Sequence, residues 1–241
     1  MTQLTKFLLG AILSLLVSSC AFDINFGEGK RGSGNVITED RNASENFTRI
    51  SAQEGLDVYV TQGENTSISV EADDNIMELI RTDIDNGKLR IHAEENIGRA
   101  TKKVFVTLPI IEALEASSGA DLVTKNEINA NELRLKSSSG ADLIVKVSAK
   151  TVDADSSSGA DIKLSGEAKK LIAEASSGSD IRASNFNVED CDASASSGSD
   201  IMVNVTGNLI ADASSGGDIR YSGSPKNVSK NKSASGSVSK Q

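Results

Sequence analysis

The chain has 241 residues, with 34 acidic and 25 basic side chains and a formal net charge of −9 at pH 7. Binding to nucleic acid relies on clustered Lys and Arg, so an acidic chain without a basic patch is a poor candidate and we expect no nucleic-acid partner. Its two cysteines exclude a disulfide framework, and an aromatic content of 3% without Trp argues against sugar binding by ring stacking.

The first twenty residues predict an exported protein. Lys6 precedes an apolar run at residues 7–17, which is typical of a secretory signal and too short for a membrane span. The sequence Val-Ser-Ser-Cys at 17–20 resembles the lipobox of bacterial lipoproteins. We therefore expect a signal peptide at 1–19 and a lipid on Cys20 that anchors the exported protein to the bacterial envelope, at the outer membrane. A plain signal peptide that happens to carry a cysteine is the alternative.

The region that follows is predicted to be irregular. Residues 20–46 include four glycines between positions 27 and 34 and read as a flexible tether, so order is expected to begin near Phe47. Alternating apolar residues at 56–60, 67–70, 88–92 and 104–108 predict strands. Asn86 and Gly87 predict a tight turn. Residues 76–80 predict a single helical turn that closes one end of the fold.

A pentapeptide, Ser-Ser-Gly-x-Asp, occurs six times between residues 117 and 218, with its aspartates 18 to 21 residues apart. These aspartates are Asp121, Asp142, Asp161, Asp180, Asp200 and Asp218. A seventh copy at 234–238 lacks the acid. One unit repeated at near-constant spacing predicts a solenoid in which each coil stacks on the next.

The residues around each repeat show which kind of solenoid to expect. Apolar residues lie at odd offsets from the glycine, which is the period of two that extended chain requires and a helix does not show. The leucine-rich horseshoe has a similar period, but its signature is absent. We predict an all-β fold, a parallel β-helix with regular repeats at 111–222 and a less regular, β-rich N-terminal part. Residues 223–241 form either a polar tail or a final coil.

The even offsets then face solvent and place Ser, Gly and Asp in three columns on one strip. Neighbouring carboxylates would lie about 5 Å apart, which is unfavourable unless something compensates their charge. In one interpretation each Asp accepts backbone N–H bonds at its own turn. In the other, the six aspartates bind Ca²⁺, since carboxylate and Ser oxygens suit hard cations. We expect no other cofactor.

Several motifs together resemble the head GIN domain family. They are Phe-Thr-Arg-Ile at 47–50, Gly-Leu-Asp-Val-Tyr-Val-Thr-Gln-Gly at 55–63, Val-Glu-Ala-Asp-Asp-Asn at 70–75, Asp-Asn-Gly-Lys-Leu at 85–89 and the Ser-Gly-x-Asp repeats. The resemblance covers residues 47–222, with Leu56 and Asp57 standing where the family name has Ile and Asn. It implies a right-handed β-helix on the cell surface, in a family described as adhesin heads of autotransporters and common in Bacteroidota.

The sequence does not favour catalysis. Six near-equivalent aspartates offer no distinct acid and base, the one histidine, His92, lies outside the repeats, and Cys191 occupies an apolar column and reads as core. We therefore predict a non-catalytic surface lipoprotein, an adhesin that recognises a surface glycan or protein through the Ser/Gly/Asp strip. The alternatives are a structural envelope component without a ligand and a polysaccharide-active enzyme, because β-helices also host such enzymes.

Overall fold

The computed structural model describes residues 28–233 and 235–241, so Cys20 and the predicted signal peptide lie outside the described residues. Within them the chain forms eighteen strands in one continuous sheet and a single 3₁₀ turn, η1 (Met77–Leu79). The strands are β1 (Val36–Arg41), β2 (Arg49–Ala52), β3 (Asp57–Gln62), β4 (Ser67–Asp73), β5 (Ile80–Asp85), β6 (Lys88–Ala93), β7 (Lys102–Leu108), β8 (Ala113–Ala116), β9 (Asp121–Thr124), β10 (Ile128–Ser138), β11 (Asp142–Ser157), β12 (Asp161–Ser176), β13 (Asp180–Ala195), β14 (Asp200–Val205), β15 (Asn208–Ala213), β16 (Asp218–Gly223), β17 (Asn227–Lys232) and β18 (Ser237–Lys240).

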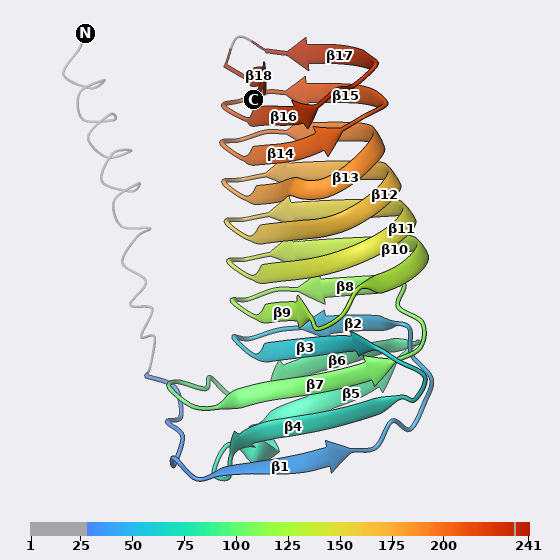
Figure 1. Cartoon of the computed structure of the whole chain (residues 1–241). Helices are drawn as coiled ribbons and strands as arrows, with labels where there is room; N and C mark the ends of the chain where they lie inside the picture. The colour runs from blue at the N-terminus through green and yellow to red at the C-terminus, as the bar shows by residue number, and fades with distance from the viewer. Residues whose placement is uncertain (1–27, 234) are drawn as a thin grey trace, which may run out of the picture.

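The fold is a β-solenoid, as the repeat predicted. Parallel pairing stacks β8, β10, β11, β12, β13, β15 and β17 along one side. On the other side, across the Ser-Gly turns, it stacks β9, β11, β12, β13, β14, β16 and β18. The strands β11, β12 and β13 are long enough to contribute to both sides, and Figure 1 shows them winding round the far edge of the rod.

The predicted inward columns form the core. The column three residues after each turn glycine is fully buried throughout: Leu122, Leu143, Ile162, Ile181, Ile201 and Ile219. Most other inward positions hold Ala or Ser, so the core is thin. Phe186 is the largest fully buried side chain. It pairs in register with Gly166 of the coil below, just after a shift in the β12–β13 register between Lys163 and Ser165.

The repeat builds a turn in which two successive residues have positive φ. At Gly119, φ is +71°, and at the preceding Ser118 it is +54°; the other five repeats follow the same pattern. Glycine tolerates this conformation because it has no Cβ, and the pair has the signs of φ found in type I′ turns. Neighbouring turns are also linked, since each glycine N–H donates to the serine carbonyl of the next coil, as from Gly119 N to Ser139 O at 3.1 Å.

A buried hydroxyl supports four of these turns from inside. Ser137 and Ser156 lie before the turn, and each donates its hydroxyl to the carbonyl of the alanine after it, both at 2.8 Å. In the next two coils the serine has changed places with the alanine. Ser179 and Ser199 lie after the turn and donate to carbonyls of the coil below, at 2.7 and 2.8 Å. Each of these coils thus keeps one hydroxyl at the same inner corner.

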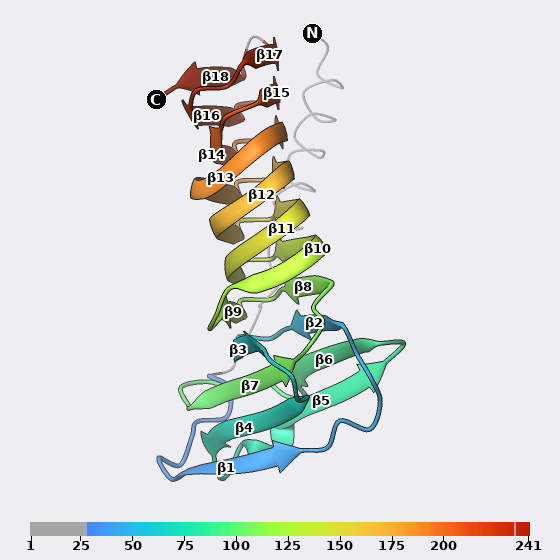
Figure 2. The same ribbon diagram turned by 45° about the vertical axis from the view of Figure 1, so that its right-hand side comes forward.

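The N-terminal end is closed by antiparallel strands. β4 pairs with β7, β1 pairs with β4, and β5 and β6 form a hairpin whose turn contains Asn86 and Gly87. η1 lies at this end beside β4, as predicted for a closing turn. Figure 2 shows this cap at the opposite end of the rod from β17 and β18. These strands cover the end of the parallel stack, and β1 and β5 are the outermost strands of the cap.

The expectation of a flexible tether up to residue 46 is wrong for residues 28–46. β1 lies in this segment, and the Asp73 carboxylate accepts hydrogen bonds from the backbone N–H of Gly34 at 2.5 Å and of Thr101 at 2.7 Å. A Cβ placed on Gly32 would lie 2.3 Å from the same carboxylate. The glycine is therefore required for close packing, a role that composition alone cannot distinguish from flexibility.

The last residues form a further coil and not a frayed tail. β17 and β18 pair in parallel with β15 and β16. Among the described residues, no helix has the length and apolar character needed to cross a membrane.

Candidate functional site

The six aspartates of the repeat stack in register on one face of the rod, and a seventh joins them. Asp57 pairs directly with Asp121, so the column runs from β3 through β9 to β16. The sequence reading missed Asp57 because its turn, at Glu54 and Gly55, lacks the Ser-Ser pair. The Gly-x-Asp spacing at 55–57 matches that of the six repeats and could have identified it. In the structure, both turn residues have positive φ, as in the repeats.

Four of the seven carboxylates are neutralised by arginines of the neighbouring outward column. Arg182 reaches Asp161 at 2.8 Å and Asp180 at 2.6 Å. Arg220 lies 3.8 Å from Asp200 and 3.4 Å from Asp218. These two pairs are bridged across adjacent coils, which offsets the repulsion expected for like charges in a column.

The remaining three carboxylates, on Asp57, Asp121 and Asp142, form no ion pair with any described residue. Loss of solvation on partial burial, with repulsion from Asp142 and Asp57, raises the pKa of Asp121 above its ordinary value. The nearby Lys102 opposes this shift in the pKa of Asp121 without reaching ion-pair distance. These three aspartates are therefore the uncompensated part of the column.

An apolar column runs beside this acidic one. The rings of Tyr59 and Phe105 stack across neighbouring strands, with centroids 5.2 Å apart and an interplanar angle of 19°. Ile144 is 44% exposed, and with Val123 and Tyr59 it lines a depression of about 230 Å³ that also contains the three aspartates. We call Asp57, Asp121, Asp142, Tyr59, Phe105, Val123 and Ile144 the acidic–apolar patch.

The structure does not show the two compensations that the sequence suggested. No described backbone N–H donates to the carboxylates of the column; those of Asp161, Asp180 and Asp218 accept hydrogen bonds from arginine. Nor does the described part of the chain hold a group of three or more His, Cys, Asp or Glu side chains arranged to hold a metal ion. Calcium binding by the column stays a prediction.

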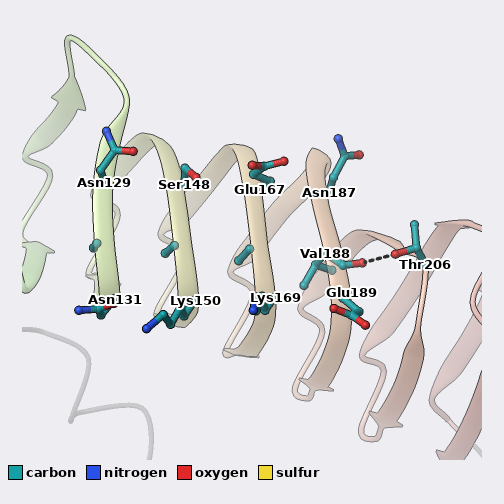
Figure 3. Close-up of a pocket in the computed structure, with 13 residues that line it drawn as sticks. Asn129, Asn131, Ser148, Lys150, Glu167, Lys169, Asn187, Val188, Glu189 and Thr206 are labelled. Atoms are coloured by element: carbon teal, nitrogen blue, oxygen red, sulfur yellow. Dashed lines mark hydrogen bonds between the residues drawn. The ribbon is translucent and has the colours of Figure 1, made fainter.

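A second feature is a shallow groove along the far edge of the rod, with a volume of about 780 Å³ (Figure 3). Its floor is a column of small apolar residues, Ala130, Ala149, Ala168 and Val188, paired in register across four coils. Its sides carry amide, hydroxyl, Lys and Glu side chains in mixed order, among them Asn129, Lys150, Glu167 and Glu189. The sequence reading assigned no role to these residues.

Two residues considered for chemistry lie away from both features. His92, in the β5–β6 hairpin, contacts the Asp83 carboxylate at 2.7 Å. Cys191 is buried in a column that holds leucine or valine in other coils. Burial, helped by the charge of Asp192, raises the pKa of its thiol to about 12. A thiol that stays protonated is a poor nucleophile, so its packing role agrees with the prediction.

Comparison with solved structures shows what the fold resembles. A putative adhesin from Bacteroides fragilis superposes with a TM-score of 0.78 at 22% identity, over 88% of this chain and 100% of that one. A putative adhesin from Parabacteroides distasonis gives 0.74 at 18% identity, over 88% and 100% of the two chains. A protein of the same species named as a putative lipid binding protein gives 0.70 at 19% identity, over 88% and 98%. At these identities the likeness shows the fold alone.

Comparison with curated proteins gave no match. The comparison with family models matches residues 46–225 to one family, and this range contains every motif that suggested the head GIN resemblance. The chain belongs to the family described as "Putative auto-transporter adhesin, head GIN domain".

Proposed function

We propose that this protein is a non-catalytic adhesin of the bacterial envelope that contacts its ligand through the acidic–apolar patch. The observation that supports this most is the division of the aspartate column. Asp161 and Asp180 already have an arginine partner, whereas Asp57, Asp121 and Asp142 have none and lie beside exposed apolar side chains. We therefore propose ligand binding at the N-terminal part of the predicted Ser/Gly/Asp strip and not along its whole length.

The chemistry of the patch suits a ligand that brings both hydrogen-bond donors and apolar surface. Ionised carboxylates only accept hydrogen bonds, so hydroxyl or ammonium groups of a glycan or protein are suitable partners. The raised pKa of Asp121 reflects unfavourable interactions that a donor from the ligand would relieve. Burying Ile144 and Tyr59 under the ligand would add a hydrophobic contribution.

A catalytic role has less support. Glycoside hydrolysis needs two carboxyl groups of distinct function beside a cleft that orients the sugar. Asp121 has a similar carboxylate on each side, and the depression beside it holds only about 230 Å³. The family and two of the three similar structures are also named as putative adhesins, and none of the three is named as an enzyme.

The test compares two triple variants of equal charge change. Full-length protein displayed on bacteria would carry either Asp57→Asn/Asp121→Asn/Asp142→Asn or the control Asp161→Asn/Asp180→Asn/Asp200→Asn. We expect the patch variant to lower attachment to mucin-coated or fibronectin-coated plates at least tenfold, and the control to change it less than twofold. Attachment that is equal for wild type and both variants would favour the structural envelope component. Release of sugars from mucin that the patch variant abolishes would favour the enzyme.

We also propose that Cys20 carries the lipid anchor. The support is the apolar run at 7–17 and the small residues that precede the cysteine. Labelled palmitate should be incorporated by the wild type and not by Cys20→Ser, and the wild type should fractionate with the outer membrane. Equal labelling of the two proteins would contradict this anchor.

A further inference from the structure

The terminal coil has lysines at positions where the coil below it has buried core residues. In register, Lys230 lies opposite Ala211, Lys232 opposite Ala213 and Lys240 opposite Tyr221. These partners are buried in the core, so three lysines occupy positions that face inward in the coil below. Departures from a fold's own pattern are expected where function or a special constraint intervenes.

The same region holds a concentration of positive charge that the net charge conceals. Residues 219–241 contain five basic residues and no acidic one, which leaves a formal charge of −14 on the other 218 residues, since the whole chain carries −9. The expectation of a chain without a basic patch therefore fails at this end. Arg220 is engaged by Asp200 and Asp218, so the charge available at the end of the rod comes from the lysines.

The side chain of Lys230 shows how the end is arranged. Its ammonium lies 5.0 Å from the centre of the Tyr221 ring and donates to the carbonyl oxygen of Val238 at 3.3 Å. The lysine thus extends across the end of the core between β17 and β18. Lys226 and Lys240 of the same coil are exposed.

We propose that this basic end, formed by Lys226, Lys230 and Lys240, is a binding site for an anionic glycan chain. A negatively charged ligand is repelled by the acidic body of the rod and attracted only to its end, so the contact is end-on. A membrane is a less suitable partner, because Val228, at 37%, is the only exposed large hydrophobic side chain among the described residues beyond 218. Figures 1 and 2 place this end opposite the cap that contains β1 and β4.

The competing explanation is that the lysines only protect the open edge. Inward-pointing charges and lysines are common means of preventing edge strands from pairing with another chain, and solenoid ends need a polar cap. This explanation predicts self-association when the charges are removed and no affinity for polyanions. The site proposed here predicts saturable binding that depends on the same charges.

The experiment uses the purified full chain, immobilised through its N-terminus, with dextran sulfate as the probe and neutral dextran as the reference. The test variant is Lys226→Gln/Lys230→Gln/Lys240→Gln, which keeps length and polarity. The matched control is Lys150→Gln/Lys163→Gln/Lys169→Gln, three exposed lysines on the body of the rod. We expect the test variant to lose affinity at least tenfold and the control less than twofold. If about three lysines contact the chain, raising salt from about 50 to 200 mM should weaken wild-type binding about 20-fold.

Three results would overturn the proposal: no binding of dextran sulfate to the wild type, equal loss in both variants, or binding only to vesicles containing phosphatidylglycerol. Dimers of the test variant in size-exclusion chromatography, with no sulfate binding by the wild type, would establish the protective cap alone. These outcomes are independent of attachment through the acidic–apolar patch, because the two surfaces share no residue.

Discussion

Replacing Phe186 with alanine tests how the thin core is held together. Phe186 is fully buried and is the only aromatic ring inside the regular repeats below Tyr221. Its coil carries an irregular register with both neighbours, between Lys163 and Ser165 below and between Ala183 and Asn187 above. Because the ring has no exposed surface, the truncated variant would leave a cavity inside the core.

Large-to-small substitutions of this kind cost about 3–5 kcal/mol, a large part of the about 5–15 kcal/mol that stabilises a typical domain. We expect urea unfolding followed by circular dichroism to show this loss for Phe186→Ala. The matched control is Phe105→Ala, whose ring is 38% exposed and stacks on Tyr59, and which should cost less than half as much. A loss below about 1 kcal/mol for Phe186→Ala, or equal losses for the two variants, would refute this account of the core.

Three further results are expected. Because the pKa of Asp121 is raised in the folded state, its ionisation disfavours folding; Asp121→Asn should raise the melting temperature at pH 7, and the gain should disappear below the unfolded pKa, near pH 3. Melting curves at the two pH values check this, and a gain that persists at pH 3 would contradict it. Cys191, with its thiol pKa near 12, should resist iodoacetamide at pH 8 in the native protein and react in 6 M guanidinium; native labelling at the unfolded rate would show that the site opens. Ser156→Ala should cost about 1 kcal/mol in urea unfolding because the carbonyl of Ala160 loses its hydroxyl donor, whereas a neutral result would mean that water replaces it.

The repeat made the central part of the fold predictable. Inward positions such as Leu122 and Ile162 follow from a period of two, because successive side chains of extended chain point to opposite faces. Near-constant spacing then places equivalent residues above one another, so the sequence alone predicts the alignment of Asp121 with Asp142. The head GIN motifs identified the family for the same reason: they are local strings of residues.

The structure was needed wherever function depends on residues distant in sequence. Asp57 joins Asp121 across 64 positions, and only the stacking of β3 on β9 brings them together. Whether a carboxylate forms an ion pair depends on the side chain one coil away, which is Arg182 for Asp161 and the apolar Ile144 for Asp121. Composition could not show either arrangement.

The sequence by itself thus determined the coil, its inner and outer faces and the family, because each of these is written in residues a few positions apart. Only the tertiary structure decided that the glycine-rich segment at 28–34 packs against Asp73, that three aspartates form no ion pair, and that Lys230 lies across the end of the core. The physical reason is the same in each case. Burial and ion pairing are set by the neighbouring coil or the end of the stack, and a one-dimensional pattern specifies the coil but not what lies above or below it.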